Sequence, residues 1–281
     1  MHLTIQLYNK KRSKVKIVLS ILISIIFVIN FSGCGANNDE KAKLKYGIGK
    51  FERQSNMCDS IGCAKIVLEY PVIKVAFSGT VNDSLENYIQ AALLDNYSEL
   101  NIKTVDEMAE RFFKDYEESR KDFPDRITSW EINNNISVIY NENSIVSFQS
   151  EFYHYTGGAH GNSGVYFSNF NSQTGKKLEL ADLLIPSYEN ELNNEAEKIF
   201  RKEKQLGANA NLESEGFWFE GNKFALNKNF GIKNEGLVFY FNSYEIAPYS
   251  MGPTEILIPY RGIKNLVKKE SLLNKVITDL N

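Results

Sequence analysis

Histidine and cysteine are scarce in this chain, with three of each among 281 residues. The sequence contains no His-Glu-x-x-His motif and no second cysteine pair, so the common zinc-binding patterns are missing. It also lacks the paired Asp and His signature of polysaccharide deacetylases, a nucleophile elbow around any serine, and a glycine loop that ends in Gly-Lys-Ser/Thr. We therefore expect no metal and no cofactor, and no motif supports catalysis.

Acidic residues are absent from the first 33 positions, which carry five basic residues and then an apolar run at residues 17–29. This run is too short to span a bilayer comfortably, since a transmembrane helix needs about 20 apolar residues, but it has the length of a signal-peptide core. It is followed by Phe31-Ser32-Gly33-Cys34, which resembles a bacterial lipoprotein box with Phe31 in place of the usual Leu. We expect a lipoprotein signal peptide at residues 1–33 and acylation of Cys34, for example with palmitate. An ordinary signal peptide or an uncleaved anchor is the alternative.

The mature chain would begin at Cys34 and contain 248 residues, of which residues 34–46 are polar and form a tether. Removal of the five basic residues leaves 27 Lys+Arg against 35 Asp+Glu, a net charge of −8. Such a surface is not expected to bind nucleic acid or an anionic membrane through bulk electrostatics, although it would suit a cationic partner. The expected location is the bacterial cell envelope, on the extracytoplasmic side. The lipid would hold the protein there, in the outer membrane and periplasm where the host has them.

Two further cysteines, Cys58 and Cys63, lie five residues apart in a loop-like stretch. Outside the cytoplasm such a pair can close a small disulfide ring, which would stabilise the fold by about 2 kcal/mol. Free buried thiols or half of a metal site are the alternatives.

The first half of the mature chain mixes strand and helix patterns. Residues 64–77 are rich in β-branched and aromatic residues and predict two short strands broken at Pro71. Helical spacing follows at residues 84–97, and Thr104 to Glu107 form a capping box that opens a second helix.

From Trp130 the hydrophobic period changes to two, which predicts a β-hairpin with a four-residue turn at residues 141–144. Further elements are expected as a strand at 165–170, a helix at 188–206, buried strands at 236–241 and 254–260, and a C-terminal amphipathic helix. The order shows no βαβ rhythm and predicts an α+β fold of antiparallel sheets with packed helices. We expect two lobes, at residues 47–125 and 126–281.

The most informative stretch is Tyr155-Thr156-Gly157-Gly158-Ala159-His160-Gly161-Asn162, hereafter the glycine loop (residues 155–162). Three glycines between two expected strands indicate a loop of fixed shape, because glycine permits positive φ and close backbone approach. It is not a phosphate loop, because a strand rather than a helix follows it.

The glycine loop, with four later segments, resembles the domain of unknown function numbered 3298, which usually follows the domain numbered 4163. The later segments are Thr174–Leu178, Phe239–Phe241, Tyr244–Tyr249 with Gly252, and Ile258–Tyr260. The resemblance covers residues 64 to about 270. In that family the pair forms the outer portion of a lysozyme-sensing anti-sigma factor and accompanies peptidoglycan deacetylases. It implies an extracytoplasmic α+β module associated with the cell wall, and it carries over no catalytic residue.

His160 has no motif that would supply a nucleophile or an orienting acid, so a structural role beside the glycine loop is favoured over catalysis. Loop aromatics make a better case for recognition, because exposed Tyr and Trp stack on sugars and anchor protein interfaces. The expected binding residues are Tyr155, Gly157, Gly158, His160, Asn162, Trp218, Tyr244 and Tyr249.

The sequence thus favours a lipid-anchored binding module of the cell envelope. Its expected ligand is a wall-related molecule such as a peptidoglycan fragment, or a protein such as lysozyme. The alternatives are a wall-associated hydrolase that uses His160 and a structural envelope lipoprotein.

Overall fold

The computed structural model describes residues 43–60, 62–75, 79–94, 97, 100–124 and 128–279. The expected signal peptide and the lipidation site Cys34 lie outside these residues. Residues Asn37–Asn281 form one compact unit. No helix in the described part of the chain combines the length and apolar character needed to cross a membrane.

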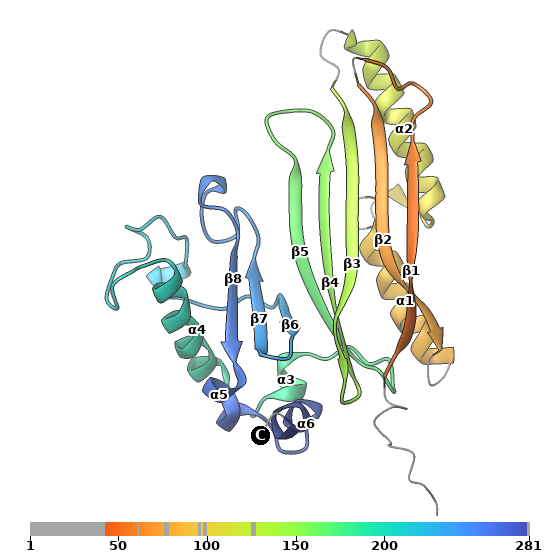
Figure 1. Cartoon of the computed structure of the whole chain (residues 1–281). Coiled ribbons are helices and arrows are strands. Elements are labelled where there is room, and N and C mark those ends of the chain that lie inside the picture. The colour runs from red at the N-terminus through yellow and green to blue at the C-terminus, as the bar shows by residue number, and fades with distance from the viewer. Residues whose placement is uncertain are drawn as a thin grey trace, which may run out of the picture. The chain divides into compact units, whose positions relative to one another are not determined.

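The architecture is α+β, as predicted, and contains two sheets. The larger has five strands in the order β1-β2-β3-β4-β5 (Figure 1). Its neighbouring strands are antiparallel except β2 and β3, which are parallel. The strands are β1 (Lys45–Gln54), β2 (Ala64–Val75), β3 (Trp130–Glu142), β4 (Ile145–Tyr155) and β5 (Asn162–Asn171).

Strand β2 is continuous, whereas the sequence predicted a break at Pro71. The parallel partner β3 pairs with β2 only from Ala64 to Glu69, and from there on β2 is paired only with β1. Pro71 therefore lies where one side of the strand is open, and its missing N–H leaves no gap in a ladder on that side.

Strand β1 begins inside the stretch expected to be a tether. Leu44 is buried, and its backbone N–H and carbonyl bond the side chain of Asn141 at 2.9 and 2.8 Å. The sequence did not predict this strand because an edge strand with one neighbour needs few apolar residues.

Two helices pack against β2 on this side of the molecule, α1 (Gly79–Leu94) and α2 (Val105–Asp122) (Figure 1). The capping box predicted for α2 is confirmed in its first half, because the Thr104 hydroxyl accepts from the Glu107 N–H at 3.1 Å. The Glu107 carboxylate accepts from the N–H of Lys103 rather than from that of Thr104.

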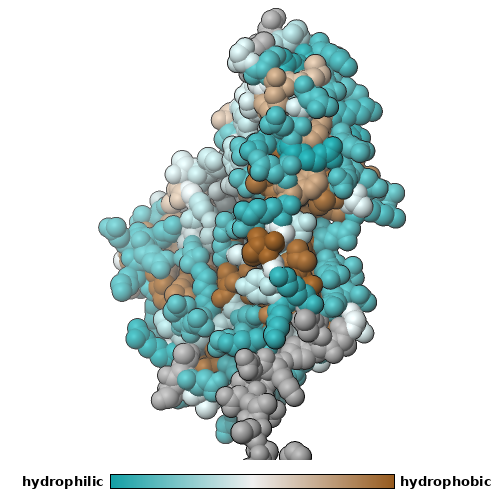
Figure 2. Space-filling model, turned by 45° about the vertical axis from the view of Figure 1, so that its right-hand side comes forward, coloured by the Kyte–Doolittle hydropathy of each residue, from teal (hydrophilic) through white to brown (hydrophobic). Residues whose placement is uncertain are grey.

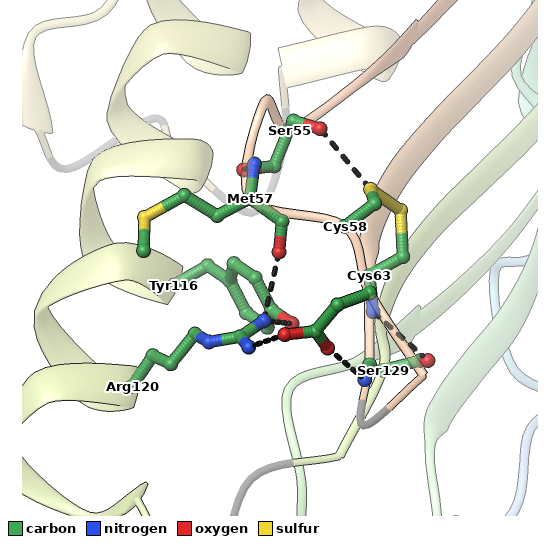
Figure 3. Close-up of polar contacts among 9 residues, drawn as sticks. Ser55, Met57, Cys58, Cys63, Tyr116, Arg120 and Ser129 are labelled. Atoms are coloured by element: carbon green, nitrogen blue, oxygen red, sulfur yellow. Dashed lines mark hydrogen bonds and ion pairs between the residues drawn. A yellow bond between two sulfur atoms is a disulfide. The ribbon is translucent and has the colours of Figure 1, made fainter.

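The loop between β1 and β2 contains a disulfide between Cys58 and Cys63 and is held against α2 (Figure 3). The Arg120 guanidinium donates to the Met57 carbonyl at 2.7 Å and forms an ion pair with Asp59. These bonds and the disulfide fix the loop beside the C-terminal end of α2.

The hairpin between β3 and β4 turns through two residues rather than the four expected. Asn143 and Ser144 have φ values of 51° and 62°, so both occupy the left-handed region. A two-residue turn of this kind matches the twist of the flanking strands.

The smaller sheet has three antiparallel strands, β6 (Phe230–Ile232), β7 (Gly236–Phe241) and β8 (Thr254–Pro259). Helix α4 (Glu189–Glu203) packs against β8 and buries Leu192, Ala196 and Phe200 (Figure 1). The shorter helices are α3 (Leu180–Leu183), α5 (Tyr260–Ile263) and α6 (Leu272–Asp279).

Asparagine side chains join the two sheets along the free edge of β5. Asn229 accepts from the Phe167 N–H and donates to the Val165 carbonyl, both at 2.8 Å. Asn242 likewise accepts from the Val165 N–H at 2.8 Å. Asn169, which is 1% exposed, donates to the Phe230 carbonyl at 2.9 Å. These amides satisfy backbone groups that a further strand would otherwise pair.

The larger sheet contains strands from both sides of residue 125, where the sequence predicted the boundary between two lobes. Strands β3, β4 and β5, which the sequence assigned to the second lobe, continue the sheet of β1 and β2. The division between sheets therefore falls between β5 and β6, because the parallel pairing of β2 with β3 spans the expected boundary.

The face on the side of α1 and α2 is largely hydrophilic, with apolar side chains in separate patches (Figure 2). Ile48 and Val72 are exposed on β1 and β2. Scattered residues of this kind are ordinary on soluble proteins. The exposed aromatics of the second lobe, in contrast, are grouped.

Candidate functional site

The glycine loop connects β4 to β5 and has a defined shape. Gly157 and Gly158 have φ values of 99° and 100°, which a side chain would strain. At Gly161 an added Cβ would meet the ring of Tyr153 at 2.4 Å, so a side chain there would require that ring to move. The Tyr155 hydroxyl closes the loop by donating to the Gly158 carbonyl at 3.1 Å.

The loop presents His160 to Tyr244 and Tyr249, two tyrosines of the segment after β7. Its imidazole stacks on Tyr249, with ring centroids 4.3 Å apart and an interplanar angle of 13°. Tyr244 lies 5.5 Å from Tyr249 and 6.4 Å from His160, centroid to centroid. We call these three residues the aromatic cluster. It joins the glycine loop to the Tyr244–Tyr249 segment.

Tyr244 is held in an unfavourable backbone conformation, with φ at 69°. The left-handed region is costly for a bulky residue, so the surrounding turn must impose it. The Glu245 carboxylate does so by accepting from the Asn242 N–H at 2.9 Å and from the Asn227 side chain at 2.7 Å. Tyr244 is 56% exposed, so this turn presents its side chain to solvent.

A cleft of about 400 Å³ lies beside the cluster and is lined by Tyr249. Its walls come from β4, β5, β7 and the segment after β7. The other lining residues are Glu151, Phe152, Ser163, Gly164, Val165, Tyr240, Asn242, Ser243, Gly252 and Pro253.

The cleft has an acidic character. Glu151 contributes a carboxylate, and no lysine or arginine is among the lining residues. Burial raises the pKa of Tyr240, and the carboxylates of Glu255 and Glu151 raise it further. The Asn242 amide is committed to both backbone groups of Val165 and acts as part of the wall.

The arrangement offers recognition chemistry rather than a catalytic constellation. The Nδ1 of His160 donates to the Gly161 carbonyl at 3.0 Å, and within the described residues His160 has no hydrogen bond to a serine or a carboxylate. No group of three or more His, Cys, Asp or Glu residues in the described part of the chain is placed to hold a metal ion. Nucleophilic catalysis needs a nucleophile–base pair, which this site does not assemble.

The second histidine of the mature chain is part of the packed sheet. His154 donates from Nε2 to the Asn134 side-chain oxygen at 2.8 Å. Burial lowers its pKa to about 4, so the ring is neutral at physiological pH.

The other expected binding residues lie around the cluster without lining the cleft. Asn162 is exposed at the start of β5. Trp218 is 53% exposed. Its backbone N–H donates to the Ile246 carbonyl at 2.8 Å, which places its loop against the Tyr244–Tyr249 segment. Tyr155, Gly157 and Gly158 shape the loop.

Sequence reasoning missed most of the cleft. Glu151, Ser163 and Tyr240 sit on strands, where a polar residue in an alternating pattern indicates only a solvent-facing position. Asn242 gave a weak signal, because a polar residue directly after a buried strand often begins a turn. These residues come together only because the side chains of Asn229 and Asn242 bond the backbone of β5.

Two family models match the chain. Residues 59–163 match the model described as Deacetylase PdaC, and residues 181–261 match the model described as Protein of unknown function (DUF3298). The glycine loop, which the sequence resemblance grouped with DUF3298, falls within the PdaC match.

Solved structures with the same fold include two members of the DUF3298 family. The protein from Bacteroides fragilis has a TM-score of 0.66 and 23% identity, covering 84% of this chain and 98% of that one. The protein from Pseudomonas aeruginosa has a TM-score of 0.62 and 20% identity, covering 80% and 94%.

Among curated proteins, the chain is similar to immunogenic proteins MPT64 of Mycobacterium tuberculosis and MPB64 of Mycobacterium bovis. The identity is 38% over 40 residues, which is 14% of this chain and 18% of theirs. The chain thus spans less than a fifth of the length of these relatives.

The fold and the matched models define a PdaC-like region followed by a DUF3298 domain. The DUF3298 match covers residues 181–261, and the fold is the one seen in two solved proteins of that family.

Proposed function

We propose that this protein is a lipid-anchored, extracytoplasmic binding module of the bacterial cell envelope that recognises a wall-related ligand at the aromatic cluster. The observation that carries the proposal is the position of Tyr249, which stacks on His160 and lines the cleft. A ring so fixed loses little conformational entropy when a ligand stacks on it.

Exposure of the rings supports the proposal. Tyr244 and Tyr249 are 56% and 41% exposed, and the neighbouring Trp218 is 53% exposed. Exposed aromatics that gather in one place mark interaction sites more often than scattered ones do. The negative charge of the mature chain would also suit a cationic protein such as lysozyme, which is the second form of the proposal.

The envelope location is supported by the sequence before Lys43 and by the disulfide. The basic and apolar runs followed by Cys34 have the order of a lipoprotein signal. A disulfide between Cys58 and Cys63 persists in oxidising compartments and is rare in the cytosol.

Hydrolysis is the alternative that the name of the PdaC model favours, because its match includes both His160 and Ser163. The Nδ1–H of His160 donates to the Gly161 carbonyl, and within the described residues no serine or carboxylate hydrogen-bonds the ring, which speaks against a nucleophile–base pair. Turnover of peptidoglycan or an ester substrate that disappears in His160→Ala, with folding intact, would favour the hydrolase over the binding module.

Binding is tested by calorimetric titration of purified protein with soluble muropeptides and with lysozyme. We expect saturable binding of at least one, weakened by Tyr249→Ala and retained by Phe123→Ala. Phe123 is a suitable control because its exposed ring lies just after α2, outside the cleft. Absence of binding to both ligand classes would overturn the proposal. The lipid anchor is tested separately, by membrane fractionation of the Cys34→Ala variant. We expect this variant to lose the acylated, membrane-bound form.

A further inference from the structure

We propose that the cleft beside the aromatic cluster is a binding site for a neutral saccharide, with one pyranose ring seated on the free side of Tyr249. This inference rests on the proposed function and names the chemical class of its ligand.

The ring of Tyr249 provides a platform on which a sugar can stack. A pyranose has an apolar face of C–H groups and a rim of hydroxyls, so it suits an aromatic ring bordered by polar groups. Tyr249 has this setting, because His160 covers one side of its ring in a nearly parallel stack while the residue also lines the cleft. The stack fixes the tilt of the platform before a ligand arrives.

Polar groups border the platform. The Glu151 carboxylate accepts from the Gln149 side-chain amide and keeps lone pairs for ligand hydroxyls, because an ionised carboxylate has about four lone-pair sites. The hydroxyl groups of Ser163 and Ser243 line the same cleft and can both donate and accept. The set of an aromatic face, a carboxylate and hydroxyls matches the alternating apolar and hydroxylated surfaces of a sugar.

The charged residues of the cleft indicate whether the saccharide is neutral or anionic. The lining residues include Glu151 and no lysine or arginine, and the carboxylates of Glu255 and Glu151 add to the effect of burial in raising the pKa of Tyr240. A phosphate or carboxylate on the ligand would meet this field without a cation to pair with. Neutral saccharides therefore fit the cleft, and anionic polymers do not.

The test uses three tetrasaccharides as probes with the full-length protein in detergent micelles: N-acetylglucosamine tetramer, glucose tetramer and galacturonate tetramer. Calorimetry and saturation-transfer NMR report affinity and the contacted sugar protons. We expect binding of at least one neutral tetramer through C–H protons, and binding of the anionic one at least about tenfold weaker.

Four variants distinguish a loss of binding at the cleft from a loss of folding. Tyr249→Ala is expected to weaken neutral binding by roughly tenfold, and Tyr249→Phe to recover most of that loss because the ring face remains. Ser163→Trp keeps Tyr249 but fills the cleft, and it is expected to weaken binding as well. Phe123→Ala serves as the exposed-aromatic control. Melting temperatures verify that each variant is folded.

The inference is overturned if no neutral tetramer binds, if the galacturonate tetramer binds as well as a neutral one, or if binding survives both Tyr249→Ala and Ser163→Trp. Should muropeptides or lysozyme bind while saccharides do not, the saccharide class falls and the binding module stands. If none of these ligands binds, both fall.

Discussion

The imidazole of His160 lies nearly parallel to the ring of Tyr249, at 4.3 Å between centroids. This contact connects the loop after β4 with the segment after β7, which come from the two matched family regions. A residue that first suggests catalysis therefore acts as the support of an aromatic platform.

Replacing His160 tests that role. We expect His160→Ala to lower ligand affinity several-fold and the free energy of unfolding by about 0.5–1.5 kcal/mol, the range for an aromatic pair. His160→Phe keeps a planar ring and is expected to restore most of both. Denaturant unfolding and titration measure the two effects. A Phe variant as impaired as the Ala variant would contradict the stacking role.

The backbone of Tyr244 supplies a second prediction. Because its φ of 69° is unfavourable for any residue with a Cβ, Tyr244→Gly is expected to be more stable than Tyr244→Ala by about 1 kcal/mol. Both variants lose the ring and are expected to lose ligand affinity to the same degree. Equal stability of the two in urea unfolding would show that the turn does not hold residue 244 in this conformation.

The sequence predicted elements whose signal is local. The Thr104 cap, the helix over Leu192 and Phe200, and the strand at 236–241 follow directly from periodicity and capping chemistry. The sequence did not predict β1 or the unbroken β2. Both depend on which strands pair with each edge of β2, and the sequence does not show that pairing.

The site was predictable in its loops and not in its strands. Glycines and exposed aromatics indicated His160, Tyr244 and Tyr249, yet nothing in the sequence paired the two loops. That pairing depends on the amides of Asn229 and Asn242 at the edge of β5, which are long-range contacts. Glu151 lines the cleft only because these contacts bring the segment after β7 next to β5.

Asn169 tests the junction between the sheets. Its oxygen accepts from the Ser147 hydroxyl at 2.7 Å and the Ile232 N–H at 3.1 Å, and its amide donates to the Phe230 carbonyl. Asn169→Ala leaves the buried Phe230 carbonyl without this donor, while the Ile232 N–H keeps the Ser147 hydroxyl oxygen at 3.2 Å, and the variant is expected to cost about 1–3 kcal/mol in unfolding free energy. Asn162→Ala, at the exposed start of the same strand, is expected to cost less than about 0.5 kcal/mol. Equal costs in urea titration would contradict this role.

His154 predicts how stability depends on pH. Burial lowers its pKa from the usual 6.5 to about 4, so below pH 6.5 the unfolded chain binds a proton that the folded chain does not. Its contribution is complete above pH 6.5 and is lost as pH falls through 4, amounting to about 3 kcal/mol. His154→Gln keeps a donor for Asn134 but does not titrate, so its unfolding free energy is expected to fall less between pH 7 and pH 4. Parallel pH profiles would contradict the assignment.

The most direct test of the central claim is the pattern of backbone NMR shifts when soluble muropeptides, or lysozyme, are added. The account predicts that the largest changes occur at residues 155–163 and 242–253, and that Tyr249→Ala removes them. Saturable changes confined to other surfaces, such as the pocket lined by Val72, Glu86 and Ile89 of β2 and α1, would contradict it.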